Sequence, residues 1–346
     1  MSRLQLGLIL AGVLLLAALA VHAAWLTRRH RPRLPEPAAA AQEPQGLDGL
    51  EPAAGSAPGA AGEGLLLPAT PERRAVLDAL IDVIATIELE HPVSGEAVLA
   101  HLPATRRVGS KPFAVEGLED GSGQWEPPTA GRRYRALQTG VQLANRSGAL
   151  NEIEYSEFVV KTQALADALG GTADVPDMLD AVARGRELDA FASAHDATLS
   201  ITLRARQTAW SAGYVQQHAA RLGFVAGVLP GRMVLPAAAA GQAPLLVLQF
   251  DPQAALAEDP AQTALREIRL SLEVPLVPRA EQPYVRLRQT AAQLAQAMDG
   301  VLTDDDGRPL GAEAMDRIGA ELEMLYDQLD ARELSAGSAL ARRLFS

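Results

Sequence analysis

Residues 267–310, EIRLSLEVPLVPRAEQPYVRLRQTAAQLAQAMDGVLTDDDGRPL, set out the elements that decide the fold. Apolar residues alternate over 268–274, which predicts a strand. A helix is expected over 283–298, because a proline opens this segment and Asp-Gly follows it. Residues 301–310 indicate a hairpin with Asp306-Gly307 at its turn. A strand, a helix and a hairpin in this order predict an antiparallel sheet covered by helices.

The rest of the folded region shows the same two patterns. Alternating apolar residues predict strands, and apolar residues every three or four positions predict helices. Strands are expected at 83–89, 112–118, 137–143, 199–205, 224–225, 233–235 and 245–250, and helices at 96–102, 151–169, 176–192, 211–222 and 313–329. We therefore expect an α+β fold with antiparallel sheets that carry helices on one face.

The folded region also contains an internal similarity. Residues 163–171 (QALADALGG) resemble residues 292–300 (AQLAQAMDG), and both segments follow a strand and precede a final helix. We interpret the region as two tandem copies of one unit, at 75–195 and 196–334, the first copy having shorter strands and a reduced hairpin. Residues 335–346 are expected to be a tail, with an exposed basic and apolar tip at its end.

The start of the chain has a different composition. Leu4–Leu26 is an apolar run long enough to cross a bilayer as a helix. A basic flank follows at once, at Arg28, Arg29, Arg31 and Arg33. Because positive charge is retained on the inner side of a membrane, residues 1–27 are expected to be an anchor with the N-terminus outside and the body inside.

A cleaved signal peptide is the alternative for the same segment. Val21-His22-Ala23 has the small residues of a cleavage site. Two features favour the uncleaved anchor: the apolar run is longer than an ordinary signal core, and export would carry the basic flank across the membrane against the usual charge bias. Residues 28–74, rich in Pro, Ala and Gly, are expected to be a disordered linker.

Composition and motifs argue against an enzyme. The chain has no cysteine and a net charge of −11, so disulfides, thiolate metal sites and sequence-independent nucleic-acid binding are not expected. No phosphate loop or nucleophile elbow occurs. Glu152, Glu154 and Glu157 suit the start of a helix, and 304–306 lacks the ligand spacing of a calcium loop. We expect no catalytic residue, metal, cofactor or small-molecule substrate.

The anchor, basic flank, Pro-rich linker and C-terminal domain, in this order, resemble the ZipA family of membrane-anchored bacterial division proteins that bind FtsZ. The C-terminal domain follows the family's sequence order at several places. These are Gly223-Phe224-Val225, Ala243–Phe250, Leu270–Pro275, Met298-Asp299-Gly300 and Val301–Asp305 before the last helix. The resemblance covers residues 196–332 and the anchor.

The resemblance implies that an open sheet face holds the C-terminal peptide of FtsZ in a shallow apolar groove. The positions that correspond to the groove are Thr198, Ser200, Leu229, Phe250 and Ser271. The family places large apolar residues at several of these positions, and this chain has Thr or Ser at three. Leu229 and Phe250 remain as candidate anchors, and ordinary core packing is the alternative for both.

The resemblance implies a non-enzymatic tether at the bacterial inner membrane, single-pass, with its N-terminus periplasmic and its body cytoplasmic. Its partners would be the FtsZ tail and the membrane, during septum formation. Two alternatives stay open. The same face could bind a different peptide in a bitopic adaptor, or the chain could be an exported envelope enzyme if the N-terminus is cleaved.

Overall fold

The computed structural model describes residues 77–239, 241–259 and 262–346. The predicted anchor and linker, and with them the basic flank at Arg28, Arg29, Arg31 and Arg33, lie outside the described residues. In the part that the structure describes, no helix combines the length and apolar character needed to cross a membrane.

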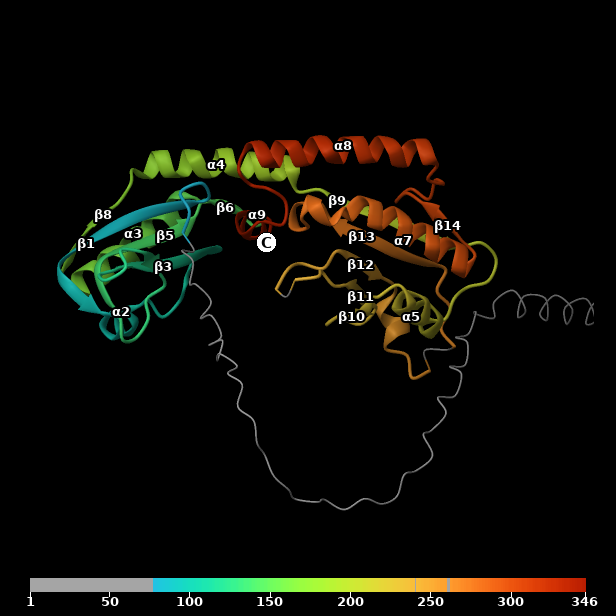
Figure 1. Ribbon diagram of the computed structural model, residues 1–346, viewed down its shortest axis with the longest axis horizontal. Helices are drawn as coiled ribbons and strands as arrows, with labels where there is room; N and C mark the ends of the chain where they lie inside the picture. Colours follow the sequence, from blue (N-terminus) through green and yellow to red (C-terminus); the bar gives the residue numbers. More distant parts are fainter. Residues whose placement is uncertain (1–76, 240, 260–261) are drawn as a thin grey trace, which may run out of the picture. The chain divides into compact units, whose positions relative to one another are not determined.

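The described chain divides into two compact units. Of the described residues, the N-terminal unit takes 77–144 and 149–186, and the C-terminal unit takes 145–148 and those from 187 to 346. The helix α4 contains the boundary between the two units. Each unit is an antiparallel sheet with helices, as expected for an α+β fold (Figure 1).

In the described residues the N-terminal unit contains one six-stranded sheet, and a short strand pair at 144–149 lies across the boundary between the units. Its elements are β1 (Asp82–Ser94), α2 (Gly95–His101), β2 (Arg107–Val108), β3 (Lys111–Glu119), β4 (Trp125–Glu126), β5 (Arg133–Gln142), β6 (Ala144–Asn145), β7 (Gly148–Ala149), α3 (Glu152–Ala168), β8 (Gly171–Asp174) and α4 (Met178–His195). The sheet has the order β2-β3-β5-β1-β8, and β4 pairs with β3. The helix α3 packs on β1, β5 and β8.

Local sequence accounts for the position of α3. Asn151 accepts hydrogen bonds from the backbone of the first turn, and Glu154 completes the capping box. The helix ends where Gly170 takes a positive φ of 65°. Buried apolar residues of α3 face those of the sheet, and a hydrogen bond of 2.7 Å joins the buried hydroxyls of Thr139 and Thr162.

The C-terminal unit has a longer list of elements. They are β9 (Thr198–Ala205), α5 (Ala212–Arg221), β10 (Val225–Ala226), β11 (Arg232–Leu235), β12 (Leu246–Gln249), α6 (Pro252–Ala255), β13 (Glu267–Glu273), the 3₁₀ turns η1 (Val274–Leu276) and η2 (Arg279–Glu281), α7 (Pro283–Met298), β14 (Gly300–Thr303), α8 (Ala312–Ala331) and α9 (Ala339–Leu344). The sheet has the order β10-β11-β12-β13-β9-β14.

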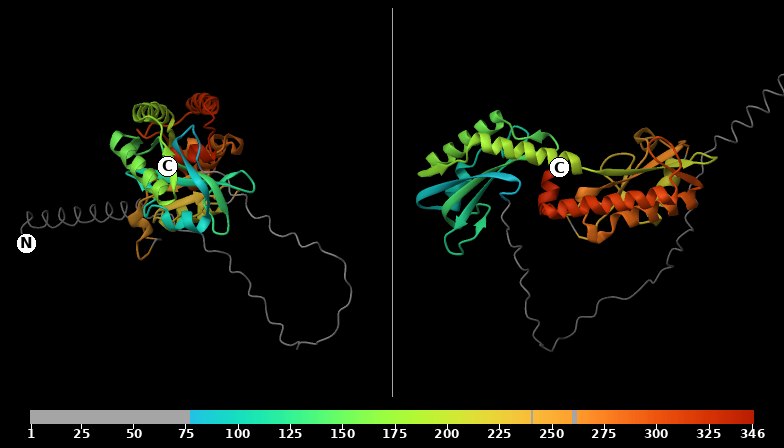
Figure 2. Two further views of the ribbon diagram at one scale, coloured as in Figure 1. Left: turned by 90° about the vertical axis from the view of Figure 1, so that its left-hand side faces the viewer. Right: turned by 90° about the horizontal axis from the view of Figure 1, so that it is seen from above.

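Helices cover one face of this sheet. α7 packs on β9, β13 and β14, and α5 packs on α7. One stripe of α7 is buried, at Leu287, Ala291, Leu294 and Met298. The helix α8 runs beside α7 (Figure 2), held by Arg288, which lies 2.7 Å from Asp316. Thr303 pairs with Pro309 across the turn at Gly307, as the hairpin prediction required.

The last residues differ from the expected exposed tip. Ser338 caps α9, and Leu344 and Phe345 are buried. Gly337, at a positive φ of 74°, donates a backbone hydrogen bond to Pro275. The end of the chain is therefore a packed helix, α9, which contacts η1.

The two sheets share a strand order. The path β3-β5-β1-β8 of one unit matches β12-β13-β9-β14 of the other. The register agrees as well, because Gly171 pairs with Leu89 and Gly300 pairs with Ala205. Positions in one sheet can thus be assigned to positions in the other.

Candidate functional site

The C-terminal sheet has two chemically different faces. Successive side chains of a strand point to opposite faces. Leu248, Leu270 and Ile201 are register partners in three neighbouring strands, and all three are buried on the side that α7 covers. The residues between them point to the other side, which we call the open face.

One row of the open face crosses the sheet from β10 to β9. Its members, in register order, are Val225, Val234, Val247, Ser271 and Ser200. The three valines make one half of the row apolar, and the two serines make the other half polar. Val225 is exposed, Val234 is half-buried and Val247 is buried. The burial of these valines therefore increases from the edge strand β10 toward the centre of the sheet.

The neighbouring row of the open face is polar. Arg232, Gln249, Arg269 and Thr202 are successive register partners. The guanidinium of Arg269 lies 3.4 Å from the carboxylate of Asp305. Asp305 in the last hairpin thus neutralises a cation of the sheet.

A groove of about 550 Å³ lies at the β10–β11 end of the open face. Leu229 in its wall is 59% exposed, and Val228 beside it is fully exposed. The other lining residues, apart from Arg232, are uncharged: Ala226, Gly227, Val234, Pro236, Ala237, Ala239, Gly241, Gln242 and Pro244. Exposed large apolar side chains next to an apolar concavity are typical of a binding surface.

A second hollow of about 500 Å³ lies where β12 ends and β13 begins. Its lining includes Thr202, Gln249, Phe250 and Arg269. Gln249 is the register partner of Arg232, which lines the first groove. The two hollows therefore occupy adjacent positions of one face, and an extended segment could lie across both.

The structure places the five positions inferred from the family resemblance as follows. Ser200 and Ser271 are register partners on the open face, and Thr198 lies one row away, paired with Glu273. Leu229 lines the apolar groove. Phe250 directly follows β12 and borders the second hollow.

Leu229 and Phe250 differ in burial. Phe250 is 7% exposed and belongs to the core, whereas Leu229 presents most of its surface to solvent. A peptide in the second hollow could reach only the small exposed part of Phe250. It could bury much new surface only on Leu229.

Sequence reasoning did not single out Val225, Val234 and Val247 as groove positions. Each had been assigned to a strand, but alternation alone does not say which of its two faces a helix covers. The register supplies this information by placing all three in the row of Ser271. The sequence offered one signal for the groove: two large apolar residues, Val228 and Leu229, stand in the short segment between Gly227 and Gly231.

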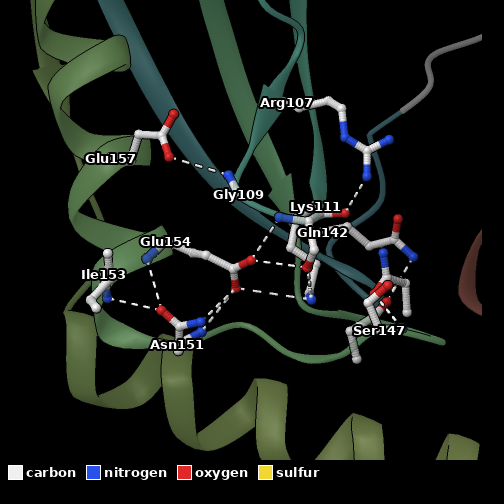
Figure 3. Close-up of polar contacts among 12 residues, drawn as sticks. Arg107, Gly109, Lys111, Gln142, Ser147, Asn151, Ile153, Glu154 and Glu157 are labelled. Atoms are coloured by element: carbon white, nitrogen blue, oxygen red, sulfur yellow. Dashed lines mark hydrogen bonds and ion pairs between the residues drawn. The ribbon is translucent and has the colours of Figure 1, made fainter.

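The carboxylates at the start of α3 have structural partners (Figure 3). Glu154 accepts hydrogen bonds of 2.9 Å from the backbone and the hydroxyl of Ser110 and lies 3.9 Å from the buried Lys111 ammonium. Glu157 accepts from the backbone of Gly109, and the hydrogen bond from Lys161 holds the pKa of its carboxyl below the ordinary value. These groups join α3 to the β2–β3 turn.

Comparison with known families shows a match in the C-terminal unit. Residues 255–321 match the family described as the ZipA C-terminal FtsZ-binding domain. The matched segment runs from the end of α6 through β13, α7 and β14 into α8, and it confirms the resemblance to the ZipA family. It includes Ser271 but begins after the groove-lining residues, the last of which is Pro244. No curated protein matches the chain.

Proposed function

We propose that this chain, which carries the ZipA-family segment in its C-terminal sheet unit, is a non-enzymatic tether that binds the C-terminal peptide of FtsZ and links the division ring to the inner membrane. The observation that carries the proposal is the apolar groove of about 550 Å³ on the open face of the sheet that contains this segment. The N-terminal apolar run and its basic flank support the membrane part.

The groove suggests how a peptide would bind. An apolar side chain entering beside Leu229 and Val234 would cover the exposed part of Leu229. Fully burying a leucine stabilises by about 1.5–3 kcal/mol. With 59% of Leu229 exposed, the contribution of this side chain is about 1–2 kcal/mol. The polar half of the row, at Ser271 and Ser200, adds hydrogen-bonding groups and little apolar area.

Weak binding of each tail suits a tether. FtsZ polymers present many tails, and many anchored chains present many grooves. Once one tail is held, its neighbours bind at a high effective concentration, so the polymer is retained although single contacts exchange. A linker at residues 28–74, as proposed from the sequence, would let the grooves reach the polymer.

Titration of the full chain in detergent with a peptide of the FtsZ C-terminus tests the proposal. We expect saturable binding that Leu229→Asp abolishes. Met324→Asp serves as a matched control, because Met324 is 58% exposed on α8 and lies away from the open face. Absence of binding at millimolar peptide would reject FtsZ as the partner. The alternative of an adaptor for a different peptide would then be favoured.

A further inference from the structure

Charged side chains of the open face have partners in almost every case. Arg204 lies 3.3 Å from Glu267, and Arg269 lies 3.4 Å from Asp305. The carboxylate of Glu273, in the row of Thr198, lies 3.2 Å from the guanidinium of Arg146. The charges of this face are thus neutralised within the C-terminal unit.

Arg232 is the exception. It is half-buried in β11, and alternation sends its side chain to the open face because its neighbour Met233 is in the core. It is the charged member of an otherwise uncharged groove lining. Among residues 77–239, 241–259 and 262–346, no carboxylate lies within ion-pair distance of its guanidinium. Its register partner is the neutral Gln249.

A half-buried cation in an apolar groove favours an anionic ligand. Burial removes water from the guanidinium, and a carboxylate restores the lost interactions through two parallel N–H···O hydrogen bonds. A ligand that filled the groove with apolar side chains alone would leave this charge without a partner, at a cost in affinity.

We propose that Arg232 selects the peptide by pairing with one of its carboxylates. This inference rests on the proposed function of the groove. Val234 and Arg232 are two residues apart on one strand, about 7 Å. In an extended peptide the acidic residue should therefore lie two positions from the apolar residue that enters beside Val234.

Calorimetric titration of the full chain tests this pairing. Arg232→Gln keeps a polar side chain of similar reach and removes the charge. We expect it to weaken the FtsZ peptide about tenfold, as for loss of a charge-assisted pair at a half-buried site. Each acidic residue of the peptide is then changed in turn to its amide. One of these peptides should bind the wild-type chain about tenfold more weakly and should lose little more on Arg232→Gln.

Arg317→Gln is the control, since Arg317 is exposed on α8 and its replacement changes the net charge equally. Equal effects of the two variants, or additive losses with every peptide, would overturn the pairing while the proposed function stands. Failure of the wild-type chain to bind any of the peptides would instead reject the proposed function. Arg232→Gln should leave the unfolding midpoint unchanged, which shows that the groove is intact.

An independent observation concerns the equivalent face of the N-terminal unit. By the register described above, Gly140 takes the place of Ser271 and Glu116 takes the place of Gln249. Leu77 lies on Gly140 and is only 8% exposed, and a Cβ at Gly140 would come within 2.4 Å of it. The backbone N–H of Leu77 donates a 3.1 Å hydrogen bond to the buried carboxylate of Glu116.

We infer that Leu77 of the chain itself covers the part of the N-terminal sheet that corresponds to Ser271 and Gln249, which a peptide crossing the open face of the C-terminal sheet would reach. Each chain therefore offers one peptide site. This inference also rests on the proposed function. Calorimetry of the full chain should give one peptide per chain, and Leu229→Asp should remove all binding. Two peptides per chain, or a second site that survives Leu229→Asp, would overturn the inference.

Discussion

Leu229 and Phe250 allow binding and stability to be separated by two substitutions of similar chemistry. Leu229→Ala removes a side chain that is 59% exposed, so the folded state loses little buried area. We expect the free energy of unfolding to change by less than about 1 kcal/mol. Because a bound peptide would bury the exposed part, we expect the peptide affinity to fall by about 1–2 kcal/mol, roughly 5- to 30-fold.

Phe250→Ala acts on the core, since Phe250 is 7% exposed. Truncating a buried phenylalanine leaves a cavity and costs about 3–5 kcal/mol of stability. We expect a large fall in the unfolding midpoint, and an affinity close to that of the wild type at temperatures where the variant is folded.

Urea unfolding and peptide calorimetry on the same preparations measure both quantities. The reasoning is refuted if Leu229→Ala lowers stability as much as Phe250→Ala, because Leu229 would then be core. It is also refuted if Leu229→Ala binds the peptide as tightly as the wild-type chain. Met324→Ala, another exposed apolar truncation, should change neither quantity.

Three further outcomes are expected. Tyr326→Phe should raise the free energy of unfolding by about 1 kcal/mol, because in the described part of the chain the buried Tyr326 hydroxyl has no hydrogen-bond partner. Burial raises the pKa of Tyr326 to about 12, so the unfolded state ionises first and wild-type stability should fall from about pH 10 to pH 12; melting curves at several pH values should show a smaller fall for Tyr326→Phe. Gly140→Ala should lower the free energy of opening of the N-terminal unit, measured by hydrogen exchange, because the new Cβ meets Leu77. An unchanged free energy of opening would contradict the close packing there. Intact mass of the membrane form should correspond to the whole chain of 36.5 kDa, and a new N-terminus after Ala23 would contradict the anchor.

Most elements of the described region could be predicted from the sequence. Asn151 and Gly170 mark the two ends of α3, and alternation located the main strands because one face of each sheet is buried. The very short strands β6 and β7 carry too few residues for a pattern. The helix α9 was taken for a tail because its apolar residues, read alone, do not show that η1 covers them.

The site was harder to predict than the fold. Ser200 and Ser271 were placed on one face by the family resemblance, and the register brings them together. The apolar side of the groove depends on which strand pairs with which, because Val225 and Val247 are more than twenty positions apart in the sequence. Nothing in the sequence marks Arg232 as a binding residue. It stands out only because the fold surrounds it with the uncharged residues of the groove lining.

The shared strand order of the two units has a consequence for folding. Tandem units of one topology can exchange strands during synthesis and form hybrid sheets. Thr139 and Leu270 occupy equivalent core positions in β5 and β13. In a hybrid sheet, Thr139 would lose its partner Thr162 and bury an unsatisfied hydroxyl, a cost of about 1–3 kcal/mol. The hydrogen bond between the two threonines therefore disfavours pairing between strands of the two units.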